Sequence, residues 1–249
     1  MSIGNKGMEN GLKKIKFSIV TVCLNAESTI LETIRSVKQQ KYPNYEYVIW
    51  DGLSKDHTLE IIRENAGADN IYVFSKKDSG LYNAMNQSAK ECNGDYILFL
   101  NSGDIFADER VLSDVADLIE KDSSKADIYF GNVLRKREAR TVLETYHGKE
   151  VVLRLLLAGR MPCHQSVFTR CEVMQRYGFD ERYSITADYH FLMKCRKYKH
   201  PFMYMDRVIS CFDCTQGISA AKSNLEEMRR QDDASMKELY PGWYYILKP

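Results

Sequence analysis

Long hydrophobic runs are missing from this sequence. No stretch of the chain approaches the roughly 20 consecutive apolar residues that a membrane-spanning helix needs. The opening residues, MSIGNKGMENGLKKIK, also lack the apolar core of a secretion signal. We interpret residues 1–15 as a flexible leader and expect a cytoplasmic protein.

A surplus of charge of one sign is missing too. The 35 Lys and Arg residues balance 34 Asp and Glu residues. Proteins that hold nucleic acid by general electrostatic attraction carry a basic surplus, so we expect no nucleic-acid partner. Hydrophobic residues make up 44% of the sequence, enough for a sizeable core, and 249 residues suffice for one large domain or a domain with an appended segment.

A disulfide framework is missing as well. The seven cysteines are odd in number and scattered along the chain, which suits a reducing compartment. Cys211 and Cys214 have the spacing of half a zinc site, but no second half follows at ligand spacing. Buried or incidental thiols are the favoured interpretation.

The first half of the chain alternates strand and helix patterns. Apolar β-rich runs alternate with segments whose apolar residues recur at helical spacing. Strands are expected at 17–24, 45–50, 71–75 and 96–100, and helices at 27–40, 56–65, 79–91 and 108–121. Ser54 or Asp56 is the expected N-cap of the second helix. Four such units predict an α/β fold with a Rossmann-like, mostly parallel central sheet and helices on both faces.

The second half is less regular, and no linker divides it from the first. Strands are expected at 128–134, 141–146, 165–169 and 202–212, an apolar run at 151–158, and helices at 188–198 and 219–239. We therefore expect a single domain.

Polar residues gather just after the predicted strands, where ligands of such sheets bind. Asn101-Ser102-Gly103-Asp104 follows the fourth strand. Mg²⁺ and Mn²⁺ prefer oxygen ligands and often take one or two protein carboxylates, with phosphate oxygens and water completing the shell. Asp104 alone suffices for that role. An ordinary turn uses the same residue types, so that alternative stays open.

Two further strand exits suit a nucleotide. An ionised carboxylate only accepts hydrogen bonds, so Asp51 would pair with the N–H of uracil or the donor edge of guanine. Residues 76–80, KKDSG, lie at a strand-to-helix turn, where free N–H groups favour an anion such as a diphosphate. A capping aspartate and a solvated basic turn are the respective alternatives.

Two residues of the second half could act on an acceptor. Asp188 opens a predicted helix and could accept the proton of an attacking hydroxyl. An N-cap role is the alternative, and the local sequence alone favours it. His164 precedes Gln165 at a predicted strand and could bind phosphate or acceptor, although a structural histidine is more common.

The ordered set of motifs resembles glycosyltransferase family 2, which has the A-type nucleotide-sugar fold. The motifs are VTVCLN at 20–25, DGLSKDHT at 51–58, DSGLYNAMN at 78–86 and LNSGD at 100–104. The likeness is closest to members that build bacterial surface polysaccharide of the colanic-acid type. It covers residues 16–220 and implies a nucleotide-binding half at 16–105, an acceptor half at 106–220, and a C-terminal helix with an aromatic tail at 221–249.

The resemblance implies a role for each matched position. Asp188 would be the catalytic base, and Asp104 would bind a divalent Mn²⁺ or Mg²⁺. The nucleotide pocket would contain Thr21, Leu24, Asn25, Asp51, Asp78 and Asn83. Positions near the donor or acceptor would be Lys77, Gly80, Asn101, Ser102, Gly103, His164, Gln165 and Ser219.

Two positions depart from the family pattern. Gly103 replaces the first of the two aspartates in the metal motif, and Ala187 shortens the acidic pair before the base. The resemblance implies an inverting enzyme that moves a sugar from a UDP-sugar to a glycan or lipid-linked acceptor. The missing aspartate keeps a second hypothesis open, a nucleotide-binding module of the same fold with impaired catalysis.

Other enzyme classes fit less well. A dinucleotide oxidoreductase would carry G-x-G-x-x-G after the first strand, where Leu24-Asn25-Ala26-Glu27 stands instead. Nucleotidyl transfer is a weaker alternative. The aromatic segment at 239–247 could pack on the body, form a homodimer, or contact the inner face of the membrane, because Trp and Tyr favour that interface. Packing is the favoured interpretation.

Overall fold

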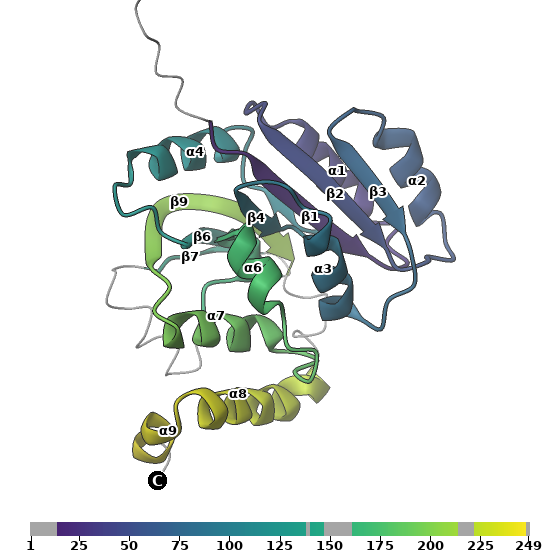
Figure 1. Ribbon diagram of the computed structural model, residues 1–249. Coiled ribbons are helices and arrows are strands. Elements are labelled where there is room, and N and C mark those ends of the chain that lie inside the picture. Colours follow the sequence, from purple (N-terminus) through teal and green to yellow (C-terminus); the bar gives the residue numbers. More distant parts are fainter. Residues whose placement is uncertain (1–13, 138–139, 147–160, 214–221, 248–249) are drawn as a thin grey trace, which may run out of the picture.

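The computed structural model describes residues 14–137, 140–146, 161–213 and 222–247. A central sheet carries helices on both faces, with the last two helices beyond one edge of the body (Figure 1). The strands are β1 (Phe17–Cys23), β2 (Tyr45–Asp51), β3 (Ile71–Ser75), β4 (Tyr96–Phe99), β5 (Ile105–Phe106), β6 (Ile128–Arg137), β7 (Arg140–Glu144), β8 (Val167–Arg170) and β9 (Phe202–Asp213). The helices are α1 (Ile30–Lys38), α2 (Thr58–Asn65), α3 (Leu81–Lys90), α4 (Val111–Lys121), α6 (Cys171–Tyr177), α7 (Ala187–Lys197), α8 (Leu225–Leu239) and α9 (Pro241–Leu247), with 3₁₀ turns η1 (His164–Ser166) and η3 (Lys222–Asn224).

The sheet has a parallel half and a mixed half. Its order is β3-β2-β1-β4-β8-β6-β9-β5, and β7 pairs with β6. Strands β3, β2, β1 and β4 are mutually parallel, whereas β8 is antiparallel to both β4 and β6. The α/β, mostly parallel sheet expected from the sequence is therefore confirmed for the first half, and the less regular second half completes the same sheet.

Two apolar cores lie on opposite faces of the sheet. The side chains of β1 point alternately into the two cores, with Phe17 and Ile19 in the first core and Val20 and Val22 in the second. Helices α1, α2 and α4 bury their apolar residues in the first core, and α3, α6 and α7 bury theirs in the second. Because every side chain of β1 is buried, the strand reads as one continuous apolar run rather than as an alternating pattern.

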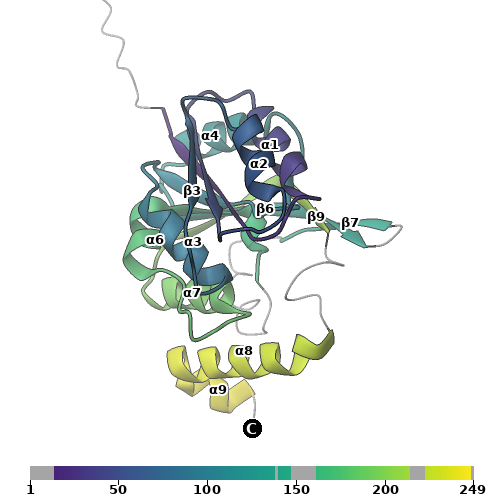
Figure 2. The same cartoon turned by 90° about the vertical axis from the view of Figure 1, so that its right-hand side faces the viewer.

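The C-terminal helices lie against the second core. α8 packs along α7 (Figure 2), and Met236 and Leu239 are buried there. Tyr240 and Tyr244 pack against the same core, while Trp243 and Ile246 are exposed. The favoured packing of the tail is thus found for part of its residues. Among the described residues, none of the helices combines the length and the apolarity that a membrane span requires.

Several element boundaries differ from the sequence expectations. The helix expected at 56–65 has His57 as its N-cap, without a side-chain cap bond, although Asp56 Oδ1 does accept the N–H of Thr58 at 3.0 Å. The Ser54 hydroxyl oxygen accepts from Asn25 instead, so Ser54 is not the cap. The strand expected at 165–169 starts only at Val167, after the η1 turn.

Among the described helices and strands, β5, α6 and α9 were not expected from the sequence. α6 starts directly after β8 without any turn residue, and β5 is only two residues long. The apolar run at 151–158 and the start of the helix expected at 219–239 lie outside the described residues, as does Cys214. Cys211 is a partly buried free thiol.

Candidate active site

The exits of β1 and β2 are joined by hydrogen bonds through Asn25. Its N–H donates to the Ser54 hydroxyl at 2.8 Å, and its side-chain oxygen accepts the N–H of Lys55 at 2.9 Å. Asn25 has a φ of 50°, a left-handed conformation that asparagine tolerates better than most residues. The neighbouring Leu24 side chain is 59% exposed. The two loops therefore form one rigid rim with an apolar side chain on its surface.

Asp51 is fully buried at the end of β2. Its carboxylate accepts the N–H of Ser54 at 3.2 Å and the hydroxyl of Ser75 at 2.8 Å. Thr21 is equally buried and donates its hydroxyl to the Leu100 carbonyl at 2.6 Å. Both side chains hold neighbouring strands together in this structure. Their assignment to the nucleotide pocket stays a prediction.

Asp78 reaches across to the exit of β2. Its Oδ1 accepts the N–H of Gly80 at 3.0 Å, which fixes the turn before α3. A β-carbon added at Gly52 would stand 2.7 Å from Asp78 Oδ2, so the carboxylate lies directly over that glycine. Lys77 is exposed beside this turn. Asp51 and Asp78 thus flank Gly52 at the same edge of the sheet.

The turn at the exit of β4 favours a glycine at position 103. Gly103 has a φ of 95°, a conformation that residues with a β-carbon rarely adopt. Its N–H donates to Thr33 Oγ1 at 3.0 Å, and the Ser102 hydroxyl lies 2.9 Å from Thr29 Oγ1. These bonds from α1 and the residue before it hold the turn and direct the chain to Asp104.

Asp104 is only 8% exposed. Burial raises the pKa of its carboxyl to about 7, while His164 and a hydrogen bond from the Gln165 side chain act in the opposite direction. A buried carboxylate whose charge is only partly balanced by its neighbours is stabilised when a cation comes close. Asp104 is therefore suited by its surroundings to a positive ligand.

Asn101 supplies a second oxygen at the β4 exit. Its side-chain Oδ1 is buried and has no hydrogen-bond partner among the described residues, which is costly for an amide oxygen. An amide oxygen and a carboxylate are both hard ligands, the kind that Mg²⁺ and Mn²⁺ take. The residues present therefore fit a divalent ion at this position.

His164 connects the β4 exit to α7. Its Nε2 lies 3.2 Å from Asn101 Nδ2, and its Nδ1 lies 3.3 Å from Asp188 Oδ2. Burial opposes the charged imidazolium, but the Asp188 and Asp104 carboxylates outweigh it and raise the pKa of His164. In the neutral ring, this geometry places the hydrogen on Nδ1, facing Asp188, and leaves Nε2 to accept from Asn101.

Asp188 lies in the first turn of α7, at its second residue. Thr186 occupies the N-cap position, so the N-cap alternative for Asp188 is wrong. Asp188 Oδ1 accepts the Tyr82 hydroxyl at 3.0 Å and the N–H of Tyr189 at 3.0 Å. Since Oδ2 faces His164, each carboxylate oxygen has its own partner.

Helix α3 connects the polar residues at the β2 exit with those around Asp188. Asp78 and Gly80 stand at its N-terminus, next to the β2 exit, and Tyr82 in its first turn contacts Asp188. No acidic residue occupies that first turn, but the N–H groups of Ser79 and Gly80 just before it already donate to Asn83 Oδ1 and Asp78 Oδ1. Helix α3 therefore runs from the turn at Asp78, beside the β2 exit, to the carboxylate of Asp188.

Further α3 side chains hold the loop that precedes α7. Asn83 donates to both oxygens of Glu181 at 3.1 Å, and Asn86 donates to the Phe179 carbonyl at 2.9 Å. No role for Tyr82, Asn86 or Glu181 was predicted from the sequence. The density of side-chain amides and the tyrosine within the run at 78–86 was the available signal. Ser219, in contrast, lies outside the described residues.

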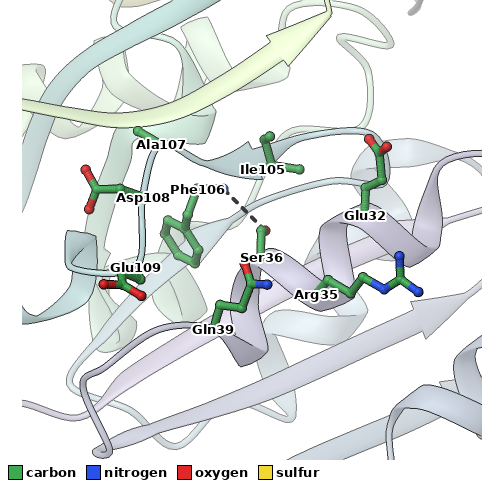
Figure 3. A pocket seen from close by; sticks show the side chains of 9 residues that line it. All are labelled: Glu32, Arg35, Ser36, Gln39, Ile105, Phe106, Ala107, Asp108 and Glu109. Atoms are coloured by element: carbon green, nitrogen blue, oxygen red, sulfur yellow. Dashed lines mark hydrogen bonds between the residues drawn. The ribbon is translucent and has the colours of Figure 1, made fainter.

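A separate cavity of about 360 Å³ lies between α1 and β5 (Figure 3). Its wall includes Ser36, whose hydroxyl accepts the N–H of Phe106 at 3.3 Å, and Asp108, which is paired with Arg207 at 2.7 Å. None of the predicted site residues lines this cavity. It therefore carries no part of the argument for the active site.

Another titratable group lies where α8 meets α7. Asp180, His190 and Glu238 offer ligand atoms within 4.8 Å of one another. Arg182 donates to both carboxylates, at 2.6 Å to Asp180 and 3.2 Å to Glu238. Because a guanidinium already neutralises both acids, we assign this group to the packing of α8 rather than to a metal.

Comparison with known proteins adds a family match. The family model described as "Glycosyl transferase family 2" matches residues 18–183. The "PGL/p-HBAD biosynthesis glycosyltransferase" of Mycobacterium bovis is 28% identical over 221 residues, 86% of this chain and 83% of that protein. The "Chondroitin synthase" of Escherichia coli is 28% identical over 200 residues, 79% of this chain but only 29% of that protein.

Solved structures share the fold. S. aureus TarS 1-349 has a TM-score of 0.71 and 21% identity, over 91% of this chain and 66% of that one. The same protein has also been solved with UDP-GlcNAc. The mannosyltransferase PcManGT from Pyrobaculum calidifontis, solved with GDP-Man and Mn²⁺, has a TM-score of 0.67 and 14% identity, over 94% of this chain and 68% of that one.

Proposed function

Because the chain belongs to glycosyl transferase family 2, we propose that it is an inverting glycosyltransferase that uses a UDP-sugar and an acceptor hydroxyl. One observation carries the proposal. Three parts of the chain meet at the exit of β4: the turn with Asn101 and Asp104, the η1 turn with His164, and the start of α7 with Asp188. This combination supplies ligands for an ion and an oriented carboxylate, which are the two requirements of the reaction.

The donor would bind across the exits of β1, β2 and β3. Asp51 would read uracil, and the rim formed by Leu24 and Asn25 would carry the base. The N-terminal end of α3 and the exposed Lys77 would face the diphosphate, with the Ser79 and Gly80 N–H groups released from Asn83 and Asp78. TarS has been solved with UDP and PcManGT with GDP-Man, so relatives of this fold hold both nucleotides. The proposed preference for UDP follows the family resemblance, because the Asp51 carboxylate would accept from the N–H of uracil and from the donor edge of guanine alike.

A divalent Mn²⁺ or Mg²⁺ would be held by Asp104 and Asn101. When bound there, the ion neutralises charge on the departing diphosphate. Since few protein ligands are present, the ion would bind mainly together with the nucleotide. Gly103 cannot be replaced by the family's usual aspartate without straining the turn, so the reduced motif belongs to this backbone.

Asp188 would act as the general base. Its carboxylate takes the proton of the acceptor hydroxyl while the hydroxyl oxygen forms a bond to the anomeric carbon and the bond to the diphosphate breaks. Attack from the side opposite the leaving group inverts the anomeric configuration. His164 and Tyr82 hold the carboxylate, and the adjacent Gln165 holds Asp104.

The acceptor would be a glycan or a lipid-linked glycan of a bacterial surface polysaccharide of the colanic-acid type. We propose that residues 16–105 bind the nucleotide, that residues 106–220 bind the acceptor, and that residues 221–249 form an appended helix and tail. Exposed Trp243 and Ile246 would contact the inner face of the membrane or a second copy.

The test measures the nucleoside diphosphate released from UDP-, GDP- and dTDP-sugars, with Mn²⁺ and with a chelator. We expect turnover with a UDP-sugar and Mn²⁺, and loss of turnover with the chelator. Melting temperatures are measured in the same mixtures, since a bound donor stabilises the fold. Stabilisation by a nucleotide without any turnover would favour the non-catalytic binding module instead.

A further inference from the structure

We infer that Tyr82 is a positioning residue for Asp188, because its phenol is the side-chain donor that fixes the orientation of that carboxylate from α3. This inference rests on the proposed role of Asp188 as base. It assigns to Tyr82 a function in the reaction that is separate from its place in the core. The residue touches neither donor nor acceptor in this scheme and acts only through Asp188.

The geometry at Tyr82 presents one hydrogen to two acceptors. The phenol oxygen lies 2.8 Å from the Ile185 carbonyl and 3.0 Å from Asp188 Oδ1. A tyrosine hydroxyl has a single hydrogen, so it donates fully to one of the two at a time. Burial and the adjacent Asp188 raise the pKa of Tyr82 well above its usual value, so the phenol keeps that hydrogen.

The choice between the two acceptors follows the charge on Asp188. An ionised carboxylate attracts the phenol hydrogen more strongly than a neutral carbonyl does. Once Asp188 has taken the acceptor's proton, that advantage is gone, and the phenol hydrogen can turn to the Ile185 carbonyl. Tyr82 thereby holds the carboxylate before proton transfer without trapping its protonated form.

The side chain of Tyr82 is itself held rigidly. Only 6% of it is exposed, and its ring packs 5.2 Å from the ring of Phe179. The groups that face Asp188 from neighbouring elements are Tyr82 on α3 and His164 on η1, with the Tyr189 N–H on its own helix. Among the described residues, removing the phenol hydroxyl leaves Oδ1 with the N–H of Tyr189 as its donor, which fixes the carboxylate less well.

The experiment is a double-mutant cycle with Tyr82→Phe and Asp188→Asn. We expect Tyr82→Phe to lower kcat by about 10- to 100-fold, the worth of one hydrogen bond to a charged group, with little change in the donor KM. In the Asp188→Asn background the same substitution should cost nothing further, because Tyr82 acts only through Asp188. A purely structural role would give multiplicative losses instead and overturn the inference.

Tyr96→Phe is the matched control. Tyr96 is at least as deeply buried, donates to the Ala126 carbonyl at 2.8 Å, and lies in the other core, on the opposite face of the sheet from Tyr82. Its substitution should lower the melting temperature as Tyr82→Phe does, yet leave kcat per folded molecule unchanged. An equal loss of kcat in both variants would mean that buried phenols matter only for folding, against the inference.

Two further results separate this inference from the proposed function. If Asp188→Asn keeps full kcat, the base assignment itself is wrong. If Asp188→Asn loses kcat but Tyr82→Phe does not, only the positioning role fails. A measurement without turnover decides independently: the ¹⁵N resonances of the His164 ring should shift in Tyr82→Phe and not in Tyr96→Phe, because Asp188 Oδ2 leaves Nδ1. Unshifted resonances contradict the inference.

Discussion

His164 Nδ1 lies 3.3 Å from Asp188 Oδ2, and this contact joins the η1 turn to the first turn of α7. Through Asn101, the same imidazole reaches the exit of β4. His164 thereby fixes the position of Asp188, the proposed base, relative to Asn101, a proposed ligand of the ion. Any change at one of them is expected to be felt at the other.

Replacing Asp104 by Asn should abolish turnover while the fold survives. The amide is nearly isosteric and removes a buried charge, so we expect an unchanged or higher melting temperature. Stabilisation of the donor complex by Mn²⁺ should disappear in calorimetry or thermal melts. Asp108→Asn, which alters an acid paired with Arg207, is the control and should keep the Mn²⁺ response. Full turnover of Asp104→Asn would exclude the metal role.

Replacing Asp188 by Asn should lower kcat by ~10²–10⁴, the usual contribution of a general base. The donor KM and the melting temperature should change little, since the amide can still accept from Tyr82 and from the N–H of Tyr189. Steady-state kinetics over a range of donor and acceptor concentrations separate the two constants. A loss confined to KM would assign Asp188 to binding rather than to proton transfer.

Restoring the family's first aspartate, with Gly103→Asp, should destabilise the protein by about 1–3 kcal/mol because of the left-handed backbone at that position. Gly103 has a φ of 95°, whereas a β-carbon at Gly67 would meet nothing within 4 Å. Gly67→Ala is therefore the control. Urea unfolding measures both free energies. An unchanged stability of Gly103→Asp would mean that the turn accepts a side chain after all.

Gly52→Ala should weaken donor binding without stopping the chemistry. The new β-carbon would lie 2.7 Å from Asp78 Oδ2, so the carboxylate must move away from the β2 exit. We expect a higher donor KM, a smaller effect on kcat, and a fold that survives because the displaced atom ends a side chain. If donor affinity measured by calorimetry stays the same, Asp78 does not border the nucleotide.

Acid should destabilise the protein partly through His190. Its side chain is 2% exposed, and burial lowers its pKa in the folded state. The unfolded chain takes up a proton near pH ~6.5 that the folded state refuses, so stability present above that pH is lost as pH falls through it. The urea midpoint between pH 7.5 and 5.5 should fall more for the wild type than for His190→Gln. Equal losses would remove His190 from the acid response.

The sequence determined the first half of the fold well. Strand–helix alternation over residues 17–121 needs only apolar runs and helical spacing, which are local properties. A boundary differed where a side chain bonds to a distant partner instead of capping the nearby helix, as Ser54 does to the N–H of Asn25. β5 was not predicted because two residues are too few to form a pattern. α6 was not predicted because it follows β8 without a turn residue between them.

Candidate residues could be named from the sequence because strand exits recur in order and carry chemically distinctive side chains. Asn101 and Asp104 were named from the β4 exit, and His164 and Asp188 from family-like segments. Their contacts could not be foreseen, since hydrogen bonds between η1 and α7, or between α3 and α7, depend on how the second half folds back. Tyr82 had no role for the same reason.

By itself, the sequence determined which segments are strands and helices and which polar residues stand at their ends, because those features follow from neighbours along the chain. Only the tertiary structure decided that Asp104 is buried with a raised pKa and that Tyr82 and His164 contact different oxygens of the Asp188 carboxylate. It also decided that Asn101 Oδ1 is buried without a hydrogen-bond partner in the part of the chain that the structure describes. Burial and pairing are properties of atoms brought together from distant positions, and no local pattern encodes them.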